Sequence, residues 1–199
     1  YIILPNENCV SIYEKIIIET NKLKFLTTGI KPIQSNTIIP LNNDKINLLY
    51  IGRRNEVKGF DFLINSFVEI LKHRNDLRLF IAGNGKPINH KDIIDLGRTE
   101  TPFDWISSVD YVISLNKTSY FDLNIIETIA LGTPLIMTTT EGHEFFKNRN
   151  GIVDVTYDNF IKDTIDSTFL NKQYKKDTIE NLNQLFEKQL SSKEYKKNL

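Results

Sequence analysis

Sulfur-containing residues are scarce in this 199-residue chain, which has one cysteine, Cys9, and one methionine, Met137. A single cysteine excludes an internal disulfide and a cysteine-based zinc site, and it fits a reducing compartment. We expect Cys9 to be a small buried residue. Because residue 1 is tyrosine and the methionine lies far inside the sequence, we expect the chain to be a fragment of a longer protein.

Long apolar runs and an excess of charge of one sign are also missing. No run approaches the roughly 20 apolar residues that span a bilayer, and the apolar start at residues 1–5 is too short for a signal peptide. Lysine plus arginine and aspartate plus glutamate both number 25, so the charge balance favours neither nucleic acid nor an anionic membrane. We expect no transmembrane segment, no nucleic-acid partner and a cytoplasmic location, with peripheral attachment at the inner membrane face left open for a full-length protein.

From residue 46 onward, short apolar runs alternate with amphipathic stretches, which predicts strands alternating with helices around a parallel sheet. Continuous apolar runs are typical of strands that are covered on both faces. The sequence therefore predicts an α/β fold, a Rossmann-like doubly wound parallel sheet of about six strands with helices on both faces. The predicted strands are residues 46–51, 77–82, 93–96, 111–115, 134–138 and 152–155.

Helices are predicted between these strands and after the last one. Apolar side chains at helical spacing indicate a helix over residues 59–73. Further helices are expected near residues 103–108, 124–131, 144–148, 157–170 and 172–188. The first 45 residues differ, with a strand-like segment at 1–4, an amphipathic stretch near 10–19, a short run at 24–26 and a polar linker or crossover at 27–44. We expect the lysine-rich tail after Ser191 to be a fraying, solvated terminus.

The residues after the first strand carry the first chemical signal, because open parallel sheets bind ligands beyond the carboxyl ends of their strands. Gly52 and Arg53 follow this strand, and Lys58 comes at the start of the next helix. A guanidinium can hold two phosphate oxygens, and an ammonium adds a point charge at the positive end of a helix. The plainer interpretation is two solvated loop cations.

Further signals follow the second, fourth and fifth strands. The Gly83-Asn84-Gly85 turn would let the backbone approach a flat ring or a phosphate closely, although it could be an ordinary turn. The amides from Phe121 to Asn124 would lie at a helix start and point at an anion over the sheet. Glu127 is predicted in the first turn of that helix, where it could accept hydrogen bonds from a ribose diol or merely stabilise the helix. We expect His143 to be a plain loop histidine.

Taken in order, these segments together with Gly132-Thr133-Pro134 resemble the C-terminal domain of retaining glycosyltransferases of family four, which have the two-domain glycosyltransferase B fold. The likeness covers roughly residues 46–156. It implies that Gly52, Arg53 and Lys58 hold the diphosphate of a nucleotide-sugar donor and that Glu127 holds its ribose. It also implies a loop facing the donor sugar and phosphate, namely Ser119, Tyr120, Phe121, Asp122 and Leu123, and a nucleobase region at Gly83, Asn84, Gly85 and Arg98.

One position departs from the family pattern. The usual signature is a glutamate, seven residues and a second glutamate, and counting back from Glu127 puts Ser119 in the first place. That first glutamate normally contacts the donor sugar, so either Ser119 and Asp122 reorganise the contact or transfer is weak or absent. The loop is similar to that of bacterial surface-polysaccharide transferases, which favours variation over loss. A second departure is the short stretch at 86–92, where the family often has a full helix.

The resemblance implies retaining transfer from a nucleotide-diphosphate sugar to a glycan or lipid-linked acceptor in surface polysaccharide synthesis. UDP-sugars are the commoner donors and GDP-mannose is the main alternative. Residues 1–45 would be the end of a missing N-terminal acceptor domain and its linker, residues 46–172 the nucleotide-sugar-binding domain, and residues 173–199 a C-terminal helix and polar tail. Catalytic residues would lie largely in the missing domain, so this chain alone should bind donor and transfer little or nothing.

We expect neither a cofactor nor a metal, because cations and a helix start can stabilise the leaving diphosphate. Two other classes fit poorly. A nicotinamide dehydrogenase would need Gly-x-Gly-x-x-Gly after the first strand, but Arg53, Arg54 and Asn55 follow Gly52. A phosphoacceptor signalling domain would need an acidic cluster at the first and third strand ends, which the sequence does not have. A non-catalytic nucleotide-binding subunit of a split or degenerate transferase stays open because of Ser119.

Overall fold

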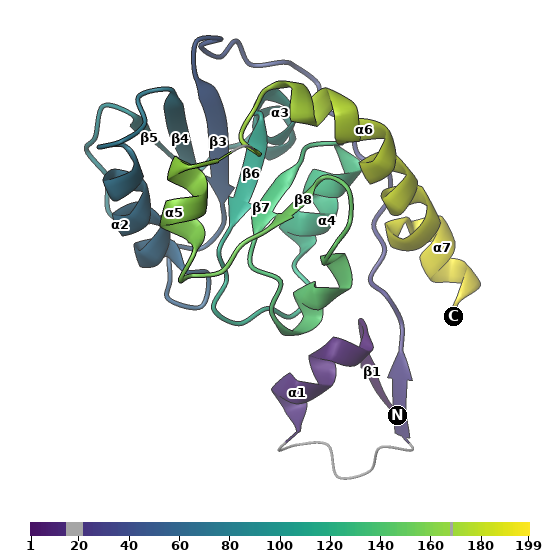
Figure 1. Ribbon diagram of the computed structural model, residues 1–199. Coiled ribbons are helices and arrows are strands. Elements are labelled where there is room, and N and C mark those ends of the chain that lie inside the picture. The colour runs from purple at the N-terminus through teal and green to yellow at the C-terminus, as the bar shows by residue number, and fades with distance from the viewer. Residues whose placement is uncertain (15–21, 168) are drawn as a thin grey trace.

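A parallel six-stranded sheet forms the centre of the computed structural model, which describes residues 1–14, 22–167 and 169–199 (Figure 1). Its strand order is β5-β4-β3-β6-β7-β8. The strands are β3 (Ile46–Ile51), β4 (Leu77–Ala82), β5 (Ile93–Gly97), β6 (Tyr111–Ser114), β7 (Leu135–Met137) and β8 (Ile152–Asp154). The predicted fold class is confirmed, and each strand begins and ends within one residue of the predicted bounds.

Helices cover both faces of this sheet, which explains why its strands are apolar along their whole length (Figure 1). Successive side chains of a strand point to opposite faces, so Leu48 packs in one core cluster and Leu49 in the other. The first cluster includes side chains from α2 (Phe60–Ile70) and α5 (Phe160–Ile165). The second includes side chains from α3 (Pro102–Ser108), α4 (Leu123–Ala130) and α6 (Gln173–Leu185).

Three of the predicted helical segments differ from the structure. Helix α5 is shorter than the predicted 157–170, and the segment predicted at 144–148 is the 3-10 helix η3 (Glu141–Phe146). A π-helical turn, η4 (Phe186–Leu190), extends α6. The prediction of a fraying tail is wrong, because the residues after Ser191 form α7 (Ser192–Lys197). Ser191 Oγ accepts from the Glu194 amide at 3.4 Å, and the Ser192 amide donates to Ile30 O at 2.7 Å, so the tail is capped and tied to the linker.

The N-terminal segment forms a small parallel sheet of its own, made of β1 (Ile2–Leu4) and β2 (Leu23–Phe25). Between them lie the 3-10 helix η1 (Glu7–Cys9) and the short helix α1 (Val10–Tyr13). The predicted amphipathic stretch extends into residues 15–19, which lie outside the described residues. Cys9 is fully buried, as expected. The polar linker runs along α3, where Asp104 Oδ1 accepts from the amides of Asn36 at 2.7 Å and Thr37 at 3.1 Å.

Residues 86–92 contain no helix, in agreement with the short stretch expected there. Within the described part of the chain, no helix is both long and apolar enough to cross a membrane. The division of the sequence at residues 45 and 172 stays a prediction.

Gly59 joins the loop after β3 to the start of α2 and brings both against the end of β6. Its φ is +62°, in the left-handed region. A Cβ on this residue would lie 1.8 Å from the carbonyl oxygen of Leu115 and 2.4 Å from the hydroxyl of Tyr157. Tyr157 donates a hydrogen bond to that same carbonyl at 2.7 Å. Only glycine lets α2 begin this close to the neighbouring strand.

We expect Gly59→Ala to destabilise the fold more than Gly97→Ala. Both glycines have a φ of +62°, but a Cβ on Gly97 would meet nothing within 4 Å. Alanine in the left-handed region costs about 1–2 kcal/mol, and we expect only this loss at Gly97. The clash at Gly59 should add about 1–3 kcal/mol. Urea unfolding of the two variants measures the difference, and equal losses would contradict the role given to the Leu115 contact.

Candidate functional site

The strand order places a topological switch point between β3 and β6, because the chain leaves β3 toward β4 on one side and later returns to β6 on the other. Ligands of open α/β sheets bind at such points, beyond the carboxyl ends of the strands. A cavity of about 280 Å³ lies there. A second cavity of about 620 Å³ adjoins it at the ends of β3 and β4, and the two share Ile51, Gly52 and Arg53.

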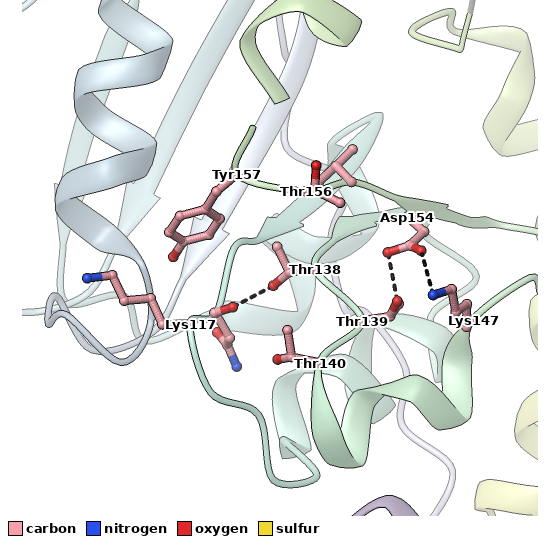
Figure 2. A pocket seen from close by; sticks show the side chains of 10 residues that line it. Lys117, Thr138, Thr139, Thr140, Lys147, Asp154, Thr156 and Tyr157 are labelled. Carbon is pink, nitrogen blue, oxygen red and sulfur yellow. Dashed lines mark hydrogen bonds and ion pairs between the residues drawn. The ribbon is translucent and has the colours of Figure 1, made fainter. Parts of the chain in front are cut away.

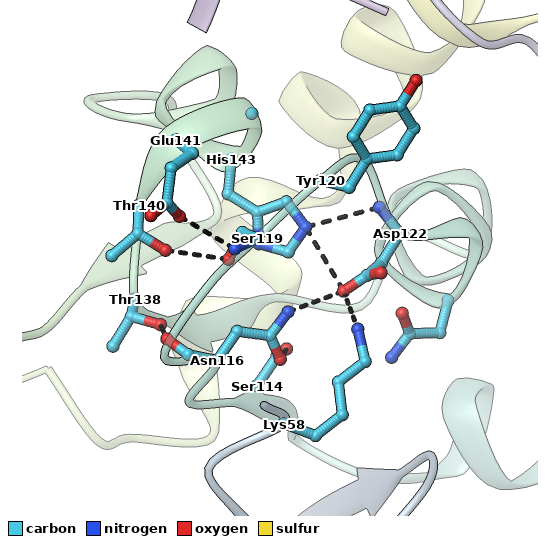
Figure 3. Close-up of polar contacts among 12 residues, drawn as sticks. Lys58, Ser114, Asn116, Ser119, Tyr120, Asp122, Thr138, Thr140, Glu141 and His143 are labelled. Carbon is cyan, nitrogen blue, oxygen red and sulfur yellow. Dashed lines mark hydrogen bonds and ion pairs between the residues drawn. The ribbon is translucent and has the colours of Figure 1, made fainter. Parts of the chain in front are cut away.

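The carboxylate of Asp122, at the start of α4, joins the two walls of the smaller cavity (Figure 3). Its Oδ2 accepts from Lys58 Nζ at 2.5 Å and from Asn116 Nδ2 at 2.6 Å. Burial raises the pKa of this carboxyl, but the hydrogen bond and charge of Lys58 and the hydrogen bond from Asn116 hold the pKa below its usual value. Asp122 is therefore a carboxylate, and its Oδ1 makes no hydrogen bond to any described residue.

His143 lies behind Asp122 and is fully buried, so the expectation of a plain loop histidine is wrong. Its Nε2 lies 3.5 Å from Asp122 Oδ2 and accepts from the Asp122 amide at 3.4 Å. Burial lowers the pKa of His143 to about 4, despite the opposing charge of Asp122. The ring is therefore neutral at pH 7 and holds the Asp122 backbone without adding a charge.

Of the two adjacent arginines after β3, only Arg53 is available to a ligand. The Arg54 guanidinium is 4% exposed and bonded to Asp95, with Nη1 2.8 Å from Oδ2. That hydrogen bond lowers the pKa of Asp95 to about 2. Arg53 is exposed, forms no ion pair with any described residue, and has its backbone carbonyl fixed by the hydroxyl of Tyr50.

Glu127 lines the same cavity as Arg53 and Lys58, as expected, but it lies in the second turn of α4. The prediction of a first-turn position is wrong because the helix begins at Leu123, with Asp122 as its N-cap. Burial raises the pKa of Glu127. Its carboxyl group accepts no hydrogen bond from the described side chains. The amides of Leu123 and Asn124 likewise have no acceptor within the described residues, as is usual at a helix start.

The structure brings most of the predicted site residues to these two cavities. Those that line the smaller one are Gly52, Arg53, Lys58, Asp122, Leu123 and Glu127, and those that line the larger one include Gly83, Asn84 and Arg98. Gly85 lines neither cavity. A Cβ on Gly85 would lie 2.4 Å from Arg54 Cδ, so this glycine leaves room for the Arg54 side chain. No group of three or more histidine, cysteine or acidic side chains in the described residues could hold a metal ion, and metal independence stays a prediction.

The first three residues of the predicted sugar loop, Ser119, Tyr120 and Phe121, line neither of the two cavities. Ser119 is fully buried, and its amide donates to Glu141 Oε2 at 2.8 Å. Phe121 is stacked on Phe146, and Tyr120 packs edge-on against Tyr13. Ser114 and Asn116 also line the smaller cavity and were not among the predicted site residues. Asn116 could have been found by the rule that drew attention to Arg53, because it follows the end of β6.

We expect the free energy of unfolding to fall as the pH drops from about 6.5 to about 4. An unfolded histidine takes up its proton near pH 6.5, whereas folded His143 does so only near pH 4. In this window the unfolded state binds more protons, so acid lowers stability, by up to about 3 kcal/mol. Urea unfolding at a series of pH values measures the slope.

In the same series, His143→Gln should flatten the slope, and His73→Gln, at an exposed histidine, should keep it. A slope that survives His143→Gln would show that the buried imidazole is not its cause.

Comparisons with known proteins show the family and the fold of the chain. The family model described as "Glycosyl transferases group 1" matches residues 45–165. An uncharacterized glycosyltransferase of Methanocaldococcus jannaschii is 27% identical over 160 residues, which are 66% of this chain and 40% of that protein.

Among solved structures, HepE of Anabaena in complex with UDP and glucose is similar, with a TM-score of 0.77 and 10% identity over 98% of this chain and 60% of that one. Sucrose-phosphate synthase from Thermosynechococcus elongatus has a TM-score of 0.78 and 14% identity over 97% of this chain and 55% of that one. At these identities the likeness shows the fold, which matches one half of a glycosyltransferase B fold. The chain spans less than two thirds of the length of each of these relatives.

Proposed function

Since the chain belongs to the glycosyl transferases group 1 family, we propose that it is the donor-binding half of a retaining family four transferase of the bacterial surface-polysaccharide type. The full-length protein would move a sugar from a nucleotide-diphosphate sugar, a UDP-sugar in the first place, to a glycan or lipid-linked acceptor. A cytoplasmic site of action, at the inner membrane face in the full-length protein, goes with this proposal. The observation that carries the proposal is the cavity between β3 and β6, which has Arg53 and Lys58 on one side and the start of α4 on the other.

The donor diphosphate would lie between these two walls. The Arg53 guanidinium can hold two phosphate oxygens at once. Lys58 has three N–H donors, of which one goes to Asp122, so two are left for a phosphate. On the opposite wall, Leu123 and Asn124 line the same cavity at the positive end of α4, and their amides have no acceptor among the described residues, so both could bind a phosphate oxygen.

The nucleoside would extend from the diphosphate toward the larger cavity. The carboxyl group of Glu127 accepts no hydrogen bond from the described residues and can accept from both hydroxyls of a ribose. The base would lie near Gly83, Asn84 and Arg98. Gly83 has a φ of +150°, and a Cβ there would lie 2.1 Å from Gly52 O, so the backbones after β3 and β4 approach closely beneath this cavity.

The donor sugar would lie beside Asp122. Ser119 is buried away from the cavity, so it cannot supply the contact that a glutamate makes at this place in the family. Asp122 Oδ1 has no partner among the described residues and can accept from a sugar hydroxyl, while Lys58 and Asn116 hold Oδ2. As the bond from the sugar to the diphosphate breaks, the cations and the α4 amides would stabilise the charge on the leaving group.

Transfer would require a domain that binds the acceptor. The β1–β2 sheet has only two strands and exposes Ile3 and Phe25, at 58% and 44%. A two-stranded sheet is marginally stable by itself. We propose that this edge continues the sheet of an N-terminal acceptor domain and that the chain without it binds donor and transfers little.

The buried Ser119 also favours a second candidate, a nucleotide-binding subunit without catalytic activity. Incubation of the full-length protein with nucleotide sugars and acceptor extracts separates the two functions. A transferase hydrolyses or transfers its donor, whereas an accessory subunit binds the donor and leaves it intact.

We expect Arg53→Ala to weaken nucleoside diphosphate binding by about tenfold or more, because a charge-assisted phosphate contact contributes about 1.5–3 kcal/mol. Calorimetry with UDP and GDP measures the change. Lys117→Ala is the matched control, because Lys117 is a cation near the same edge of the sheet that pairs with Glu56 and does not line this cavity. Unchanged affinity in Arg53→Ala, or an equal loss in the control, would place the diphosphate elsewhere.

Glu127→Ala should weaken binding of a ribonucleoside diphosphate by about tenfold, because the carboxylate loses hydrogen bonds from both ribose hydroxyls. The same substitution should leave the weaker binding of the 2′,3′-dideoxy analogue unchanged, since that sugar has no hydroxyls to donate. Calorimetry on the four combinations measures the coupling. If both ligands lost the same affinity, Glu127 would not contact the ribose.

A further inference from the structure

A third cavity, of about 530 Å³, lies at the same edge of the sheet, beyond the carboxyl ends of β6, β7 and β8 (Figure 2). Its volume falls within the range of about 300–1,000 Å³ that small-molecule sites occupy. Asn116 lines both this cavity and the one at the switch point. A ligand here would therefore lie next to the donor site without overlapping Arg53 or Glu127.

Three of the hydroxyl groups that line this cavity, those of Thr138, Thr139 and Tyr157, have already given their protons to the protein. Thr138 Oγ1 donates to Asn116 O at 2.7 Å, Thr139 Oγ1 donates to Asp154 Oδ1 at 2.7 Å, and Tyr157 Oη donates to Leu115 O at 2.7 Å. Each partner is a carbonyl or carboxylate oxygen, which can only accept, so the direction of each bond is fixed. A hydroxyl has one proton, so these three oxygens can offer a ligand only lone pairs.

Each of the two lysines that line the cavity is paired with a carboxylate. Lys117 Nζ lies 2.7 Å from Glu56 Oε1, and Lys147 Nζ lies 3.8 Å from Asp154 Oδ2. A phosphate group presents mostly acceptors and negative charge, so it would face lone pairs and a carboxylate here. The lining instead suits an uncharged ligand that brings several hydrogen-bond donors.

We propose that this cavity binds a neutral saccharide, with Thr139, Asp154 and Tyr157 accepting hydrogen bonds from its hydroxyls. Sugar hydroxyls supply the donors that these accepting oxygens need, and Lys117 and Lys147 can donate to ring and hydroxyl oxygens. This assignment rests on the proposed function, under which the saccharide is the end of the acceptor that receives the sugar. It would lie across Asn116 from the donor.

The test is a titration of the ¹⁵N-labelled chain, followed by its amide resonances, with the methyl α-glycosides of glucose, galactose and mannose. Inorganic phosphate serves as the anionic probe. We expect at least one glycoside to shift the amides at 138–140 and 154–157 saturably and phosphate to leave them in place. Asp154→Asn, which replaces an acceptor oxygen by an N–H donor, should weaken that glycoside by about tenfold. Asp166→Asn, at an exposed carboxylate beyond α5, should have no effect.

Thr139→Val, which removes one accepting oxygen, serves as a second variant if Asp154→Asn does not fold. The inference is overturned if no glycoside saturates these amides, if phosphate shifts them instead, or if the folded cavity variant binds as tightly as the unsubstituted chain. A UDP titration of the same sample keeps the two proposals apart. If UDP binds and no glycoside binds, only the proposal of a saccharide site is overturned. If a glycoside binds and UDP does not, the proposed donor site is overturned and the saccharide site is supported.

Discussion

β3 pairs with β4 along its whole length, from Ile46 opposite Leu77 to Ile51 opposite Ala82, and with β6 only through Leu48 and Leu49. The chain runs outward from β3 on one side of the sheet and returns to β6 on the other. The loops after these two strands therefore diverge, and a crevice opens between them that no crossover helix fills. The site, the two adjoining cavities and the start of α4 all take their positions from this one pairing.

The ion pair of Lys58 with Asp122 crosses that crevice. Such a partly buried pair gains little net stability, because each charge loses water that the partner must replace. Its value lies in orientation: Gly59 lets α2 begin against Leu115, which brings Lys58 within reach of Asp122. His143 completes the arrangement as a neutral ring, so the network holds the carboxylate in place without a second cation.

Sequence patterns predicted the sheet well, because strands covered on both faces must be apolar throughout, and this property is local. Arg53, Lys58 and Glu127 could also be found from their places after strands and near helix starts. The directions of the side chains within the loop at 119–123 could not be predicted from the sequence. Ser119 turns inward because Thr140 and Glu141, about twenty positions away, meet it. The burial of His143 and the attachment of α7 to Ile30 depend likewise on contacts between distant segments.

The central claim, that a nucleoside diphosphate binds at the β3–β6 switch point, is tested most directly by mapping amide chemical shifts during a UDP titration. The account predicts the largest saturable changes at Arg53, Leu123 and Asn124, which line the cavity and whose amides have no acceptor in the described structure. Smaller changes should extend to Gly83 and Asn84. Saturable shifts centred on any other part of the chain, or no shifts at all, would contradict it.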